Sequence, residues 1–120
     1  IRRAGEVAKL FFESGHIVIC TFISPFEKDR SFVRSLFPEG RFFEVYIKCD
    51  LEVCKRRDPS GLYRKAMTGE IKDFTGVSSP YEAPQNPEIV LESDLQSVKD
   101  SVAHIIDRLK LVHIIMKGSA

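Results

Sequence analysis

Basic side chains are concentrated in one short part of this sequence. Between residues 55 and 72 there are six basic and two acidic residues, so this segment carries a formal charge of +4 while the rest of the chain sums to −3. The basic residues are Lys55, Arg56, Arg57, Arg64, Lys65 and Lys72. A cationic segment on a slightly acidic body indicates a local site for a polyanion. On charge alone, the alternative of a solvated helix face is favoured.

The cysteines and histidines do not form a metal-binding or nucleophile motif. Cys20, Cys49 and Cys54 lack metal-ligand spacing and have no neighbouring acid–base partner, so we expect inert thiols in a reducing compartment. His16 and His104 flank apolar segments, where core or surface roles are expected. We therefore predict no metal ligands in this chain and a cytoplasmic location.

The elements that position these side chains follow from apolar periodicity and breaker residues. Strands are expected at residues 16–23, 41–48 and 88–92. Helices are expected at residues 4–13, 25–36, around 53–54, 62–68 and 95–109. Ser24, Pro25 and Glu27 predict a capping box for the second helix, and Asp50 is placed to cap the third. The alternation of strands and helices predicts an α/β fold with a parallel sheet, on which the last helix packs an apolar stripe.

Ligands bind parallel sheets at the carboxyl ends of the strands. Two segments are expected there, the turn after Ile23 and the excursion over residues 58–87. The second is basic and contains several prolines, and long loops within a compact domain are usually functional. On the residues alone we predict a transferase that binds a phosphate-bearing ligand under a lid.

Composition bounds the class of protein. A chain of 120 residues with 43% hydrophobic and 29% charged residues fits one soluble domain and excludes a disordered tail. The longest apolar run, residues 16–23, is too short to span a bilayer, and the first residues lack the apolar core of a signal peptide. The net charge of +1 predicts no general attraction to nucleic acid or membranes.

Several collinear motifs resemble the adenylyl-sulfate kinase (adenosine 5′-phosphosulfate kinase) family. They comprise residues 1–10, Phe22-Ile-Ser-Pro-Phe26, Leu51-Glu-Val-Cys-Lys-Arg-Arg-Asp-Pro-Ser-Gly-Leu-Tyr-Arg-Lys-Ala66, Gly69-Glu-Ile-Lys-Asp-Phe-Thr-Gly76 and Ser79-Pro-Tyr-Glu-Ala-Pro-Gln-Asn-Pro-Glu88. The resemblance covers nearly the whole chain and is highly specific. It implies a three-layer P-loop kinase fold that transfers the γ-phosphate of ATP to the 3′-hydroxyl of adenylyl sulfate, forming 3′-phosphoadenylyl sulfate. It also implies Mg²⁺ and a homodimer.

One departure from this family outweighs the others. The chain contains no Gly-x-x-x-x-Gly-Lys-Ser/Thr segment, whose backbone N–H groups and lysine cradle the phosphates of ATP. We therefore expect residues 1–120 to be a single partial domain, the carboxyl-terminal portion of the enzyme. Its N-terminal strand and Walker A loop, and with them the catalytic residues and the Mg²⁺ ligands, are expected outside this chain, which should be inactive alone.

The resemblance also implies roles for individual residues. Phe74 corresponds to an aromatic ring that stacks on the substrate adenine, with a loop anchor as the alternative. The further substrate-binding candidates are Ile23, Ser24, Lys72, Asp73 and Thr75. Ser24 is phosphorylated in some members of the family, but we expect no covalent role for it here. For Lys72, a phosphate or sulfate contact and simple solvent exposure remain open.

The expected lid spans approximately residues 57–87. Within it, Arg57, Arg64 and Lys65 are the candidates for contacting ATP, with an ion pair to Asp58 as the alternative role of Arg57. Ser60 stands where the family usually has lysine, which weakens any phosphate contact there. This departure keeps open a second function, a non-catalytic regulatory domain that binds adenylyl nucleotides, of the kind found fused to ATP sulfurylase.

Overall fold

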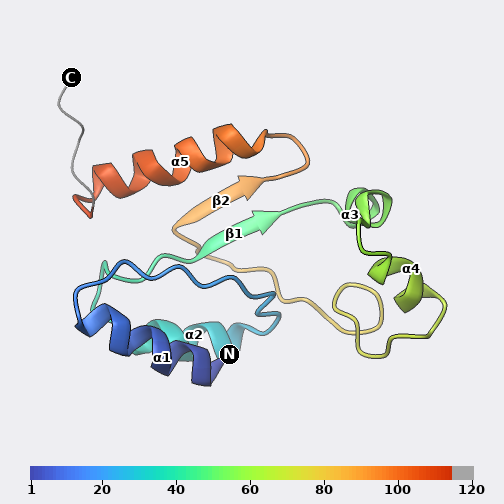
Figure 1. Cartoon of the computed structure of the whole chain (residues 1–120), viewed down its shortest axis with the longest axis horizontal. Helices are drawn as coiled ribbons and strands as arrows, with labels where there is room; N and C mark the ends of the chain where they lie inside the picture. Colours follow the sequence, from blue (N-terminus) through green and yellow to red (C-terminus); the bar gives the residue numbers. More distant parts are fainter. Residues whose placement is uncertain (115–120) are drawn as a thin grey trace.

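The computed structural model describes residues 1–114 and has three layers. Figure 1 shows two helices on one side of a parallel pair of strands and one helix on the other side. The three layers are α1 (Arg2–Glu13) with α2 (Glu27–Ser35), β1 (Val45–Lys48) with β2 (Ile89–Glu92), and α5 (Val98–Leu111). The predicted α/β fold with a parallel sheet is confirmed. No helix within residues 1–114 is long and apolar enough to cross a membrane.

Two short helices extend from the carboxyl end of β1. α3 (Leu51–Arg57) and α4 (Leu62–Met67) lie beyond the strand pair, and the loop that follows α4 returns to β2 (Figure 1). The Asp50 carboxylate accepts hydrogen bonds from the N–H groups of Glu52 and Val53, which confirms the predicted cap of α3. The Asp58 carboxylate accepts the N–H groups at the start of α4, so this acid is a helix cap and forms no ion pair with Arg57.

The predicted strand at residues 16–23 is wrong. These residues have no strand partner among the residues that the structure describes, and most of their apolar side chains are exposed. Ile17 is 62% exposed, Ile19 86% and Ile23 67%. A β-branched run favours extended backbone, but a strand also needs a neighbour that takes up its N–H and C=O groups.

The predicted capping box of α2 is also wrong. The helix begins at Glu27, and Ser24 lies outside it with a φ of 43°, in the left-handed region. The N–H of Glu27 instead donates to Oε2 of Glu82 at 2.6 Å. A carboxylate 55 positions along the chain therefore serves as the N-terminal cap, a partner that a local sequence pattern does not reveal.

The apolar core among the described residues is small. Its buried hydrophobic members are Ala8, Ala66, Ile89 and Leu91. The predicted apolar stripe of α5 is not a buried core, because Leu95, Val98 and Val102 are exposed and only Ile105 and Leu109 are partly covered. The radius of gyration is 16.4 Å, against about 14 Å for a compact domain of this length. The chain therefore folds into layers without closing a full core between them.

Candidate functional site

The six residues expected to bind substrate line one cavity. This open, mainly apolar space of about 1150 Å³ lies between the helix layer, the strands and the loop after α4. The residues are Ile23, Ser24, Lys72, Asp73, Phe74 and Thr75. They come from two segments separated by about fifty positions in the sequence. The fold therefore brings together the two segments that the sequence placed at the ligand end of the sheet.

The segment that carries Phe74 is a tight loop held by its own backbone. The carbonyl of Phe74 accepts hydrogen bonds from three successive N–H groups, those of Val77, Ser78 and Ser79. The N–H of Phe74 donates to the hydroxyl of Ser78 at 3.0 Å. Asp73, directly before it, has a φ of 54°. The backbone on both sides of the ring is thus constrained, while the side chains of Lys72 and Asp73 are exposed.

Tyr63 supports the ring of Phe74. The two rings meet edge to face with their centroids 5.0 Å apart, so Phe74 is partly covered by α4. Burial, followed by the charge of the Cys54 thiolate, raises the pKa of Tyr63, and burial also raises the pKa of Cys54. Both groups stay neutral at physiological pH, which is consistent with the inert thiols expected from the sequence. Sequence reasoning gave Tyr63 no role, although it lies within the predicted lid, directly before Arg64.

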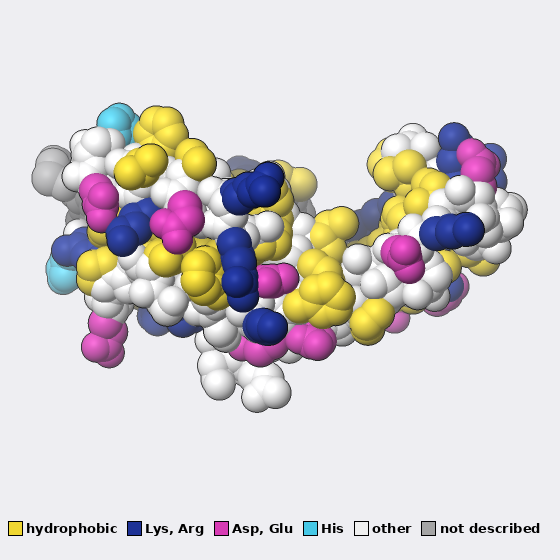
Figure 2. All heavy atoms as spheres, turned by 90° about the horizontal axis from the view of Figure 1, so that it is seen from below, with side chains coloured by type: hydrophobic (Ala, Val, Ile, Leu, Met, Phe, Trp, Pro, Cys, Tyr) yellow, Lys and Arg dark blue, Asp and Glu magenta, His cyan; other side chains and the backbone are white. Residues whose placement is uncertain are grey.

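The three lid residues expected to contact ATP lie on the two short helices, Arg57 at the end of α3 and Arg64 and Lys65 on α4. Arg64 lines a second, shallower hollow of about 550 Å³ on α3 and α4. Arg57 donates to the carbonyl of Ser93 at 3.0 Å, and the Lys65 ammonium lies 3.4 Å from the Glu70 carboxylate. In Figure 2 the part of the molecule that carries α3 and α4 projects from the body. A notch bordered by hydrophobic side chains separates this part from the body.

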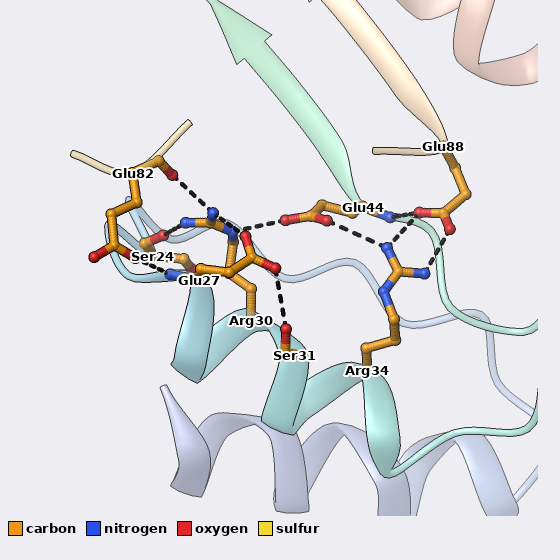
Figure 3. A network of polar contacts seen from close by, with 8 residues as sticks. All are labelled: Ser24, Glu27, Arg30, Ser31, Arg34, Glu44, Glu82 and Glu88. Atoms are coloured by element: carbon orange, nitrogen blue, oxygen red, sulfur yellow. Dashed lines mark hydrogen bonds and ion pairs between the residues drawn. The ribbon is translucent and has the colours of Figure 1, made fainter. Parts of the chain in front are cut away.

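A polar network behind the Ser24 turn was not expected from the sequence. Arg30 and Arg34 of α2 reach across to Glu44, which precedes β1, and to the segments at Glu82 and Glu88 (Figure 3). The spacing of Glu27 and Arg30 indicates a local helix pair. The carboxylate and carbonyl partners from distant segments leave no comparable signal in the sequence.

The described residues offer no ligand set for a divalent cation. No group of three or more histidine, cysteine, aspartate or glutamate side chains in residues 1–114 could hold a metal ion. Of the two acidic residues that line the cavity, Glu44 pairs with Arg30 and Arg34, and Asp73 is exposed. The family resemblance places the Mg²⁺ ligands outside this chain, so the described residues carry no argument about the ion.

Comparison with known proteins agrees with this geometry. The sequence profile of the adenylylsulphate kinase family matches residues 1–92. A probable adenylyl-sulfate kinase of Bacillus subtilis (strain 168) is 58% identical over 110 residues, covering 92% of this chain and 55% of the relative. An adenylyl-sulfate kinase of Clostridium kluyveri is 59% identical over 109 residues, covering 91% and 54%. The chain thus spans about half the length of these relatives.

A solved structure shares the fold. The Mycobacterium tuberculosis APS kinase CysC, in complex with AMPPNP and APS, superimposes with a TM-score of 0.85 at 41% identity, covering 91% of this chain and 64% of that chain. The three-layer P-loop kinase fold that the sequence predicted is confirmed by this similarity. With the family profile matching more than three quarters of its residues, the chain belongs to the adenylylsulphate kinase family.

Proposed function

We propose that this chain provides the adenylyl-sulfate site and lid of a kinase that transfers the γ-phosphate of ATP to the 3′-hydroxyl of adenylyl sulfate. The observation that carries the proposal is the convergence of Ile23, Ser24 and Phe74, with their neighbours, on one cavity. The Phe74 ring offers a flat apolar face to an adenine, and Lys72 a positive charge to the sulfate or phosphate. The Mycobacterium tuberculosis relative was solved in complex with AMPPNP and APS, which supports ATP and adenylyl sulfate as the two ligands.

We further propose that additional polypeptide completes the fold and supplies the phosphate-transfer loop. The exposed apolar run at residues 17–23, which has no strand partner among the described residues, supports this proposal. The relatives are nearly twice as long as the matched region. Since the chain contains neither a Walker sequence nor a cation site among its described residues, we derive no chemical step through Mg²⁺.

The second candidate is a domain that binds adenylyl nucleotides without chemistry. Ser60 favours it, because an ammonium is absent from a position next to the basic hollow on α3 and α4. Both functions require the same substrate cavity. They differ only in whether phosphate is transferred.

Binding of adenylyl sulfate to the full-length protein that carries this chain tests the shared part of the proposal. Titration calorimetry should show one site, and Lys72→Ala should weaken it by about tenfold, the effect of one charge-assisted contact. Leu95→Ala, at a side chain that is 76% exposed in the turn between β2 and α5 and does not line the cavity, should leave the affinity unchanged. The absence of binding by the wild type would overturn the proposed site.

A further inference from the structure

Arg30 is the buried charged residue of the described part of the chain. Its side chain is 8% exposed, and arginine is almost never buried to this extent unless it is paired. Its guanidinium reaches three segments that are distant in sequence. Nη1 donates to the Ser24 carbonyl at 2.6 Å, Nη2 donates to the Glu82 carbonyl at 2.7 Å, and Nε lies 2.7 Å from Oε1 of Glu44 (Figure 3).

Two of these partners, the carbonyls of Ser24 and Glu82, are neutral, so charge balance does not account for these contacts. The carboxylates of Glu44 and Glu27 already offset the positive charge of Arg30 at 2.7 Å each. The contact with Glu44 is ionic, without the alignment of a hydrogen bond. The carbonyls of Ser24 and Glu82 gain a fixed direction instead, because the guanidinium is a rigid planar fork.

The two carbonyls belong to the two segments that form the proposed substrate site. Ser24 holds a φ of 43°, a left-handed conformation that costs a non-glycine residue free energy and persists only when its surroundings hold it. Glu82 lies near the end of the expected lid. Its N–H donates to the Pro25 carbonyl at 2.8 Å, and its carboxylate accepts the N–H of Glu27 at 2.6 Å. Two direct hydrogen bonds therefore join this part of the lid to residues 25–27, and Arg30 links it to the Ser24 carbonyl.

We propose that Arg30 is a positioning residue for adenylyl-sulfate binding. Through the carbonyls of Ser24 and Glu82 it fixes the Ser24 turn relative to the lid that carries Phe74, and so sets the width of the cavity between them. This inference rests on the proposed function. It assigns to Arg30 a role in substrate affinity that is separate from its charge pairing with Glu44.

Arg34 provides a matched control on the same helix. It is one turn further along α2, and it also pairs with Glu44, at 3.2 Å, and with Glu88. Among the described residues it contacts neither the Ser24 turn nor Glu82 (Figure 3). Arg30→Lys and Arg34→Lys both keep the positive charge, but only Arg30→Lys replaces the fork that reaches both carbonyls.

Steady-state kinetics and amide hydrogen exchange of the full-length protein test the proposal together. Arg30→Lys should raise the KM for adenylyl sulfate by about tenfold or more, as expected for a displaced binding segment, and leave the KM for ATP within about twofold. The amides of Glu27 and Glu82 should exchange faster in this variant. Arg34→Lys should lower the thermal midpoint about as much as Arg30→Lys does. It should change neither the KM for adenylyl sulfate nor the exchange of these amides.

A second variant covers the case in which Arg30→Lys does not fold. Glu82→Gln alters the same junction from an exposed side chain that caps α2, and should raise the KM for adenylyl sulfate by about two- to tenfold while lowering the thermal midpoint slightly. Equal KM values in wild type, Arg30→Lys and Glu82→Gln, or equal shifts in Arg30→Lys and Arg34→Lys, would overturn the role of Arg30. A wild-type protein that does not bind adenylyl sulfate would overturn the proposed function as well.

Discussion

Phe74 is the residue on which the substrate assignment depends most. Its ring is held edge-on by Tyr63, with the centroids 5.0 Å apart, and its backbone is fixed by the hydrogen bonds of the loop. A base that stacks on the exposed part of the ring gains on the order of 1–3 kcal/mol. The ring is therefore placed to supply affinity without further ordering of its own backbone.

Removal of this ring should weaken adenylyl sulfate selectively. Phe74→Ala should raise its dissociation constant by roughly ten- to a hundredfold, while the affinity for ATP changes less. Calorimetric titration of the wild type and of Phe74→Ala with adenylyl sulfate and with ATP measures the change in each affinity. Equal losses for the two nucleotides, or none for either, would remove Phe74 from the substrate site.

The Arg34–Glu88 pair makes part of the stability pH-dependent. Burial opposes ionisation of Glu88, but hydrogen bonds from Arg34 and the N–H of Glu44 outweigh it and hold the pKa of Glu88 below its ordinary value of 4.5. A carboxyl whose pKa is lowered in the folded state stabilises that state above its unfolded pKa. The contribution is then lost as the pH falls through the folded pKa.

Urea unfolding at several pH values tests this linkage. The difference in the free energy of unfolding between wild type and Glu88→Gln should be constant above about pH 5 and shrink below pH 4. Glu70→Gln is the control, since the Glu70 carboxylate is 62% exposed in its pair with Lys65. A pH-independent difference between wild type and Glu88→Gln would contradict the assignment.

At the scale of the elements, α1 and α2 pack closely together because Gly5 has no side chain. A Cβ built on Gly5 would lie 2.9 Å from Cγ2 of Val33 and 3.2 Å from Cδ1 of Leu36, closer than packed carbon atoms normally approach. The glycine is buried near the start of α1, where its flexibility would otherwise weaken the helix. The close approach of the two helices therefore accounts for it.

Gly5→Ala should consequently destabilise the protein in spite of the better helix propensity of alanine. The expected loss is about 1–3 kcal/mol, typical of an overpacked contact. Thermal or urea unfolding measures it, and adding Val33→Ala should recover part of the loss. A more stable Gly5→Ala variant would show that the helices move apart freely.

The elements also show where sequence reasoning works. Asp50 caps α3 as predicted, because the cap and its N–H partners are two and three positions apart. The cap of α2 was missed, because its carboxylate belongs to Glu82 and only the fold brings it to Glu27. The strand predicted at residues 16–23 failed for a related reason: its composition is that of a buried strand, but pairing depends on a distant partner.

The same limit, that local patterns can be predicted and distant contacts cannot, applies to the candidate site. The segments around Ser24 and Phe74 were found from motifs, and the structure places them on one cavity. Arg30 and Tyr63 were not, because their importance lies in contacts with distant residues. The contacts of Arg57 with the Ser93 carbonyl and of Lys65 with Glu70 were likewise not apparent from the charge pattern.

At the scale of the whole molecule, the exposed apolar surface is the main feature. Four apolar side chains are buried in the described residues, whereas a larger number of bulky ones along residues 17–23 and α5 are exposed. The radius of gyration of 16.4 Å agrees with a structure whose layers enclose unfilled space. Both observations support the proposal that further polypeptide packs against β1 and the helix layer.

Transfer of labelled phosphate from ATP to adenylyl sulfate tests most directly whether additional polypeptide supplies the phosphate-transfer loop. The full-length protein and the 120-residue chain are incubated separately with γ-labelled ATP and adenylyl sulfate, and labelled 3′-phosphoadenylyl sulfate is measured. The full-length protein should form the product and the chain alone should not, because the chain contains no phosphate-cradling loop. Product formation by the isolated chain would contradict the assignment of the phosphate-transfer loop to additional polypeptide. No product from a full-length protein that binds both nucleotides would contradict the proposed kinase.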